Sequence, residues 1–438
     1  MPRGLTRLSL DVFGRSLRPA LLLSLGVGAA FAAGGRPPDR GPLHLIDLAL
    51  TGEPAESTSS IAELREAGPE GLARLLEARE EDDRGASAQD WERVIDGVAR
   101  QRYATESGLY WYTDVDEALE AAAEADRPVL MLRMLGELDE VYSCANSRYF
   151  RTLLYADPAI SAELRDNWVV AWTSERPVPK LTVDFGDGRV WQTTVTGNSI
   201  HYVLNSYGDV LDALPGLYSP DAFLDGLVAA RGLHNAVRDL DDPAPTLSLW
   251  HRRELERSAD RAARTLGRPA SAVAAAYRTP LTPDAVVEAP RVMAMAMSKM
   301  MVEQPLARAV VPTTPLSAGS PDALKRGQAL GTDAQWAELG RSFPVRLSAP
   351  SLALIRAERA TGGPEMFASL ERTVGRDTAF NELWFHGLLH AWLEQAPDVS
   401  WEALNRRVYD TMFATPAADP WLGLWNPEVY DGLPPASR

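Results

Sequence analysis

Two kinds of hydrophobic spacing divide the chain into regions. In residues 60–100, and again after residue 245, apolar residues recur three and four positions apart, which predicts amphipathic helices. Between these regions, helical segments alternate with short runs that are apolar at almost every position, most clearly Val129–Leu135 and Trp168–Thr173. Near-continuous apolar runs are typical of strands buried on both faces of a sheet. We therefore expect an α/β region in the middle of the chain, with helical regions on either side.

The order of elements predicted for residues 114–230 is α-β-α-α-β, then a hairpin-like segment around Asp184–Gly188, then β-β-α. Strands that alternate with helices favour a parallel core, and the tight turn Ser206–Asp209 favours a final antiparallel pair. Asp239–Pro245 has the composition of a linker. Four parts are therefore expected: a targeting segment at 1–33, a linker and helical preface at 34–105, an α/β domain at 106–234 and an all-α C-terminal domain at 246–438.

The first 33 residues have the pattern of a secretory signal peptide. Several arginines precede the apolar run Pro19–Ala33, which is too short to span a bilayer comfortably, and Ala30–Ala32 forms an A-x-A cleavage site. The alternative is an uncleaved N-terminal anchor. With the signal removed, we expect a periplasmic or secreted protein that is not an integral membrane protein and works in an oxidising compartment.

Composition narrows the classes of function. The 438 residues include 44 basic and 60 acidic side chains, for a net charge of −16, which argues against a nucleic-acid partner. The single cysteine, Cys144, excludes an internal disulfide framework and any cysteine-rich metal site within one chain. Neither a glycine-rich phosphate loop nor a haem-attachment motif is present, so no cofactor is expected.

The lone cysteine follows the first predicted strand, at the start of a helix. Ser143 is a candidate N-cap for this helix, and a helix N-terminus favours the thiolate form of Cys144. Arg148 adds positive charge one turn later, and Ser147 is able to donate a hydrogen bond to the thiolate. Ser147 cannot close a disulfide, however. A Cys-x-x-Ser site of this kind can hold a mixed disulfide, but a second thiol must complete the turnover.

With this placement, the middle domain resembles a thioredoxin-like protein with a single-cysteine Cys-x-x-Ser site. Gly197–Asn205 aligns with the Gly-x-Pro-x step of that family, with Ser199 in place of the usual cis-proline. The resemblance implies a thioredoxin fold for residues 106–234 and a substrate groove at Asn198, Ser199 and His201. It also implies thiol–disulfide exchange with Cys144 as the nucleophile. The expected partners are extracytoplasmic protein thiols or disulfides, or a small-molecule thiol.

A second interpretation keeps the thioredoxin fold without the chemistry. In a redox-inactive binding or scaffold protein, Cys144 would be a small buried hydrophobic residue, as free cysteines commonly are. Ser199 favours this interpretation, because the family's cis-proline normally shapes the substrate groove. His201 could then be a structural strand histidine, where the first hypothesis would have it approach Cys144.

A third hypothesis concerns the helix predicted over residues 378–395. Glu382, His386, His390 and Glu394 are spaced four residues apart and share one face of that helix. Two histidines at this spacing can chelate a transition metal, and a neighbouring carboxylate such as Glu382 could complete the set. The alternative is the polar stripe of an amphipathic helix, which the absence of an H-E-x-x-H motif favours.

Overall fold

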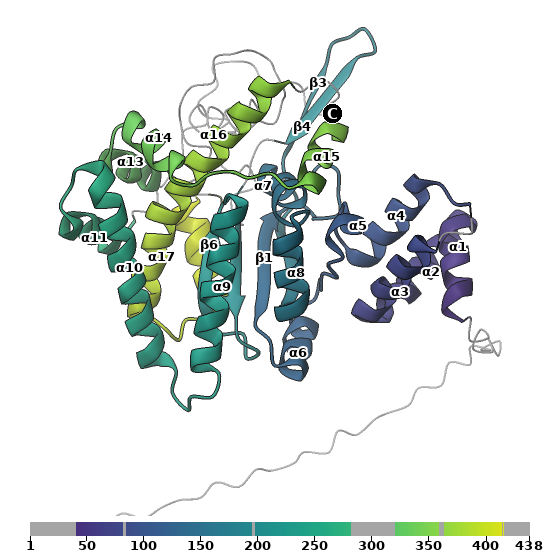
Figure 1. Ribbon diagram of the computed structural model, residues 1–438, viewed down its shortest axis with the longest axis horizontal. Coiled ribbons are helices and arrows are strands. Elements are labelled where there is room, and N and C mark those ends of the chain that lie inside the picture. Colours follow the sequence, from purple (N-terminus) through teal and green to yellow (C-terminus); the bar gives the residue numbers. More distant parts are fainter. Residues whose placement is uncertain are drawn as a thin grey trace, which may run out of the picture. The chain divides into compact units, whose positions relative to one another are not determined.

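A computed structural model describes residues 41–81, 85–194, 198–281, 320–358, 363–413 and 415 (Figure 1). The chain divides into two units, Met1–Gly41 and Pro42–Arg438, and every element below belongs to the second unit. The signal peptide predicted over residues 1–33 lies outside the described residues. Within the described ranges, no helix combines the length and apolar character needed to cross a membrane.

Five helices precede the α/β region and share a core of their own. They are α1 (Pro42–Thr51), α2 (Pro54–Glu66), α3 (Gly68–Glu80), α4 (Ala88–Ala99) and α5 (Ala104–Ser107). Ser87 caps the start of α4, because its hydroxyl accepts a hydrogen bond from the Asp90 amide. The apolar face of α4, with Trp91, Val94 and Val98, is buried in a cluster to which α2 and α3 also contribute. The helical pattern predicted for residues 60–100 is confirmed.

Four strands form the central sheet in the order β2-β1-β5-β6. They are β1 (Val129–Leu135), β2 (Val169–Arg176), β5 (Ser199–Leu204) and β6 (Val210–Pro215). β1 and β2 run parallel, whereas β5 runs antiparallel to both of its neighbours, so the sheet is mixed. This confirms the expected α/β class, with its parallel first pair and antiparallel last pair. The hairpin-like segment forms a separate sheet of two strands, β3 (Lys180–Asp184) and β4 (Val190–Thr194).

Two groups of helices accompany the central sheet. Those within the α/β region are α6 (Val115–Ala125), α7 (Ala145–Tyr149), the π-helical η1 (Phe150–Leu154), α8 (Pro158–Asn167) and α9 (Pro220–Val237). Those that follow are α10 (Ala244–Leu266), α11 (Ala270–Arg278), α13 (Pro321–Leu330), α14 (Asp333–Arg341), α15 (Ala349–Glu358), α16 (Pro364–Phe380), the π-helical η2 (Asn381–Phe385), α17 (His386–Gln395), α18 (Trp401–Arg407) and the π-helical η3 (Val408–Met412). Buried side chains of both groups belong to one hydrophobic core, which extends from Leu109 to Phe413 along the chain.

Helices cover both faces of the sheet, which explains why most residues of its strands are apolar. β5 and β6 are buried at every position. Successive side chains of a strand point to opposite faces, and accordingly His201 packs against Phe223 of α9 while Tyr202 donates a hydrogen bond to Asn405 of α18. Figure 1 shows α8 and α9 side by side over the near face of the strands. A strand enclosed in this way has no polar side to expose.

The helix predicted over residues 378–395 contains a π-helical turn. α16 ends at Phe380, η2 follows directly, and α17 begins at His386 without a break. η2 lies against the chain just after β6. At Gly216, where φ is +75°, an added Cβ would come within 2.5 Å of the Asn381 side chain, so only glycine fits. Asn381 also donates a hydrogen bond of 2.8 Å to the Leu217 carbonyl. These contacts hold the start of α17 beside β6.

Candidate functional site

Cys144 lies where the sequence placed it, between β1 and α7, but its side chain is fully buried. The residue itself is the N-cap of α7, with extended backbone, whereas Ser143 was expected to have that position. Its amide donates a hydrogen bond of 3.2 Å to the Leu135 carbonyl, which fixes the start of the helix against the end of the strand. The thiol is part of the hydrophobic core.

The two predicted helper side chains make hydrogen bonds to oxygen atoms around Cys144. The Ser147 hydroxyl lies 2.5 Å from the Ser143 hydroxyl and 2.8 Å from the Cys144 carbonyl. The Arg148 guanidinium donates to the Ser143 carbonyl at 2.6 Å and to the Thr194 hydroxyl at 2.9 Å. These bonds join α7 to its own first turn and to β4. These local hydrogen bonds are enough to explain why a serine and an arginine occur at positions 147 and 148.

The predicted groove residues are also buried. Ser199 accepts a hydrogen bond of 2.8 Å from Asn146, which joins β5 to α7, and Asn198 donates one of 3.0 Å to Thr415. The His201 Nε2 lies 2.7 Å from the Tyr155 hydroxyl. Burial lowers the pKa of His201 to about 3, so the ring is neutral at pH 7. Asn198, Ser199 and His201 therefore lie in the interior, while Gly197 lies outside the described residues.

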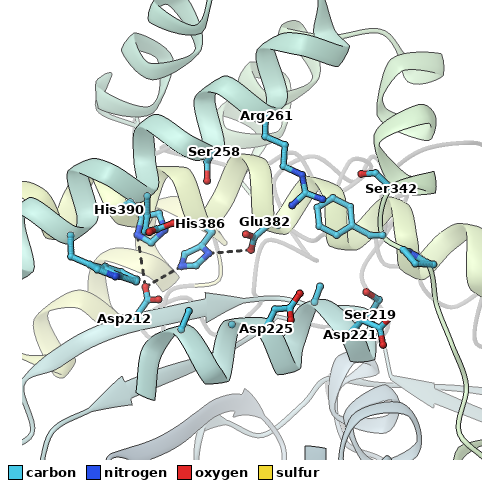
Figure 2. Close-up of a pocket in the computed structure, with 17 residues that line it drawn as sticks. Asp212, Ser219, Asp221, Asp225, Ser258, Arg261, Ser342, Glu382, His386 and His390 are labelled. Atoms are coloured by element: carbon cyan, nitrogen blue, oxygen red, sulfur yellow. Dashed lines mark hydrogen bonds and ion pairs between the residues drawn. The ribbon is translucent and has the colours of Figure 1, made fainter. Parts of the chain in front are cut away.

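The continuous helical segment of η2 and α17 places the side chains of Glu382, His386 and His390 near β6 (Figure 2). The His386 Nε2 lies 3.0 Å from Oδ1 of Asp212, and its Nδ1 lies 3.2 Å from Oε2 of Glu382. The His390 Nδ1 lies 3.9 Å from the same Asp212 oxygen. Glu394 does not join them, because it forms ion pairs with Arg252 and Arg278. Three of the four residues selected by spacing therefore meet at one place.

Asp212 is the residue that sequence reasoning missed. It has no role in the hypotheses drawn from the sequence, yet it is a carboxylate that is 1% exposed inside a buried strand, VLDALP. A charged residue inside a buried strand needs a partner. An aspartate within an otherwise apolar strand sequence is therefore the feature from which the site could have been suspected. His251 of α10 was missed as well. Its Nδ1 lies 3.1 Å from the His390 Nδ1, and the ring of Trp250 packs edge-on against both histidines.

The three histidines of this cluster have different charge states. Burial acts to lower the pKa of His386, but Asp212 and Glu382 outweigh it and raise the pKa to about 10. Burial lowers the pKa of His390 far below its ordinary value, and the charged His386 lowers it further. Burial also lowers the pKa of His251 to about 4. At neutral pH in the unliganded protein, His386 is thus an imidazolium, while His390 and His251 are neutral and share a hydrogen bond between their Nδ1 atoms.

The cluster lies at one end of a pocket of about 390 Å³. Figure 2 shows His386 and His390 at that end, with Ser219, Asp221 and Ser342 at the other. The lining includes five acidic residues: Asp212, Asp221, Asp225, Glu254 and Glu382. The one arginine of the lining, Arg261, lies over the ring of Phe343 with its guanidinium carbon 4.0 Å from the ring centroid. The pocket therefore has an excess of negative charge.

The donor chemistry of the cluster fits a metal ion. Asp212, His386 and His390 each offer one ligand atom, and the three atoms lie within 4.8 Å of one another. Imidazole nitrogen and carboxylate oxygen are ligands of transition metals such as zinc. Glu382, the carboxylate that the sequence suggested as a third ligand, is not one of these three residues, and it contacts His386 instead. No protein-family model, curated protein or solved structure matches the chain.

Proposed function

We propose that residues 106–234 form a thioredoxin-like domain without thiol chemistry, and that this domain and the C-terminal helices together bind a small cationic ligand. The sheet order supports the thioredoxin-like assignment, with a parallel first pair and an antiparallel β5 between β1 and β6. So does the position of Cys144 between the first strand and its helix. The Asn146 to Ser199 hydrogen bond joins the two segments that flank the active site in the family.

The burial of Cys144 is the observation that supports the redox-inactive hypothesis for this domain. Thiol–disulfide exchange requires a thiolate to reach a sulfur atom of the substrate, so the Sγ must be accessible. Cys144 is 0% exposed, and it packs in the hydrophobic core. This favours the binding or scaffold protein over the monothiol oxidoreductase, in which Cys144 would be the nucleophile and Ser147 and Arg148 its stabilising neighbours.

The lining of the pocket indicates the class of ligand. Five carboxylates outnumber the two cations of the lining, Arg261 and the charged His386, so the pocket attracts positive charge, and low-dielectric walls strengthen that attraction. Trp250 and Phe343 supply aromatic surface, and Ser219, Ser258 and Ser342 supply hydroxyl groups. A small cation or a compact molecule with a cationic group matches this lining. The N-terminal pattern of residues 1–33 supports export, so we place the binding function in the periplasm or outside the cell.

Alkylation of the single thiol tests the first half of the proposal. Because Cys144 is the chain's one cysteine, iodoacetamide labelling reports on it alone. We expect less than a tenth of the native protein to be labelled within the time that labels the urea-denatured protein completely. Rapid labelling of the native protein at mildly acidic pH would contradict the proposal and support thiol exchange.

Thermal shifts in a panel of small ligands test the second half. We expect small organic amines to raise the melting temperature, and the corresponding carboxylic acids to leave it unchanged. Replacing Asp225→Asn and Glu254→Gln together should remove most of the shift. Asp260→Asn, an exposed carboxylate of α10 outside the pocket, is the matched control and should retain the shift. Equal shifts in both variants would refute the pocket as the binding site.

A further inference from the structure

We propose that Asp212, His386 and His390 bind a divalent transition-metal ion at the closed end of the pocket. This inference rests on the proposed function, because it names the cation for one part of the same pocket. In the described part of the chain, these three residues form the one group whose donor atoms converge within 4.8 Å. They come from β6 and from two successive turns of α17, so the sheet and the helical segment each supply part of the site.

The distances between donor atoms are close to those of a coordination shell. Transition metals bind nitrogen and oxygen ligands at about 2.0–2.2 Å, so two ligands of one ion lie about 2.8–3.6 Å apart for bond angles between about 90° and 110°. The His386 Nε2 and Asp212 Oδ1 are 3.0 Å apart, within that range. The His390 Nδ1 and Asp212 Oδ1 are 3.9 Å apart, and all three ligand atoms lie within 4.8 Å of one another, so His390 must move closer to complete the shell.

Glu382 has the position of an orienting carboxylate. Metal-bound histidines usually donate their second ring N–H to a carboxylate or carbonyl, which fixes the tautomer and the orientation of the ring. The His386 Nδ1 lies 3.2 Å from Glu382 Oε2, while its Nε2 faces Asp212. Glu382 thus holds His386 with Nε2 directed at the proposed ion. The π-helical turn η2 carries Glu382 and joins directly to His386.

An ion-pair network without a metal explains only part of this arrangement. Such a network accounts for the contacts of His386 with Asp212 and Glu382. It leaves the buried His390 Nδ1 at 3.9 Å from Asp212, too far for a hydrogen bond, and the His390 Nδ1 is hydrogen-bonded to the His251 Nδ1 at 3.1 Å instead. An ion between Asp212 and His390 would take the place of this hydrogen bond, with the His390 Nδ1 as its ligand. The convergence of two imidazoles on one buried carboxylate is the arrangement that favours the metal.

The metal is expected to belong to the imidazole-binding class. Two histidines and one carboxylate suit zinc, iron(II), manganese(II), nickel(II) or copper(II), whereas magnesium and calcium prefer oxygen ligands. Three protein ligands leave at least one position for water or for a ligand in the pocket, as in catalytic rather than structural zinc sites. The same pocket is lined by the carboxylates Asp225 and Glu254, which raise the local concentration of cations.

Binding of cobalt(II) and zinc to the untagged full-length protein tests the site. After dialysis against EDTA and then metal-free buffer, we expect calorimetry to show one zinc ion per chain, and cobalt(II) to give d–d absorption bands. His390→Gln should weaken zinc binding at least tenfold and remove the cobalt bands. His44→Gln, an exposed histidine of α1, is the matched control and should change neither.

The outcomes separate this inference from the proposed function. If wild-type protein binds no zinc, or if His390→Gln binds it as well as wild type does, the metal site is wrong. Binding of small amines would then continue to support the pocket. Circular dichroism of metal-free His390→Gln checks its fold. Should that variant unfold, Glu382→Gln replaces it, and a failure of Glu382→Gln to weaken zinc binding would overturn the assignment.

Discussion

Cys144 and Asp212 are both buried at the central sheet, but the chemical groups around them differ. Both residues belong to or adjoin strands of the central sheet, and both are at most 1% exposed. Around Cys144, the hydrogen bonds of Ser147 and Arg148 go to hydroxyl and carbonyl oxygens. Around Asp212, charged and neutral imidazoles converge on one carboxylate at the end of a pocket. The comparison shows that a pocket lined by converging ligand atoms identifies the candidate site better than a position in the fold does.

The largest loss of stability is expected from removing the Asp212 carboxylate, on which His386 and His390 converge. Asp212→Ala leaves the buried His386 with Glu382 alone, and breaking a buried charge pair costs about 3–5 kcal/mol of unfolding free energy. Urea denaturation in EDTA at pH 7 measures this loss. Asp225→Ala, an exposed carboxylate of the same pocket, is the control and should change stability by less than about 0.5 kcal/mol. A loss below 1 kcal/mol for Asp212→Ala would mean that the cluster is not a strong ion-pair network.

A pH titration of stability sharpens the contrast between the two regions. His201 has a pKa of about 3 in the folded protein and about 6.5 when unfolded, so the unfolded chain binds the extra proton. Its contribution to stability is therefore complete above pH 6.5 and is lost as the pH falls towards 3. Between pH 7 and pH 5, wild type should lose about 2 kcal/mol more than His201→Phe does. Parallel curves for the two proteins would show that His201 becomes protonated without unfolding.

The two replacements of the lone cysteine differ in polarity. Cys144→Ser places a hydroxyl group in the apolar core, whereas Cys144→Ala leaves only a small cavity. We expect the serine variant to be less stable than the alanine variant by about 1 kcal/mol, because a buried hydroxyl without a partner is costly. Denaturant unfolding measures the difference, and both variants should bind pocket ligands as wild type does. A serine variant as stable as wild type would indicate a polar, accessible environment for the thiol.

Much of the fold follows from local patterns, while the site depends on contacts that are distant in sequence. The apolar run Val129–Leu135 gives β1 with the same bounds, because burial on both faces favours apolar residues at nearly every position. The four-residue spacing placed Glu382, His386 and His390 together, since one helix face is a local property. Asp212 is 174 residues from His386, and no periodicity connects the two. The burial of Cys144 likewise results from tertiary packing, which the helix-start pattern does not contain.

Glu394 provides the smallest and most specific test of this distinction. By spacing it belongs with His386 and His390, yet its carboxylate pairs with Arg252 and Arg278, which are partly exposed. Such ion pairs contribute little, so Glu394→Gln should lower the unfolding free energy by less than about 1 kcal/mol. We expect its zinc affinity to equal that of wild type, whereas His390→Gln, one turn earlier on the same helix, loses binding. If Glu394→Gln reduced zinc binding as strongly, the relevant set would be the helix stripe, and the convergence on Asp212 would not define the site.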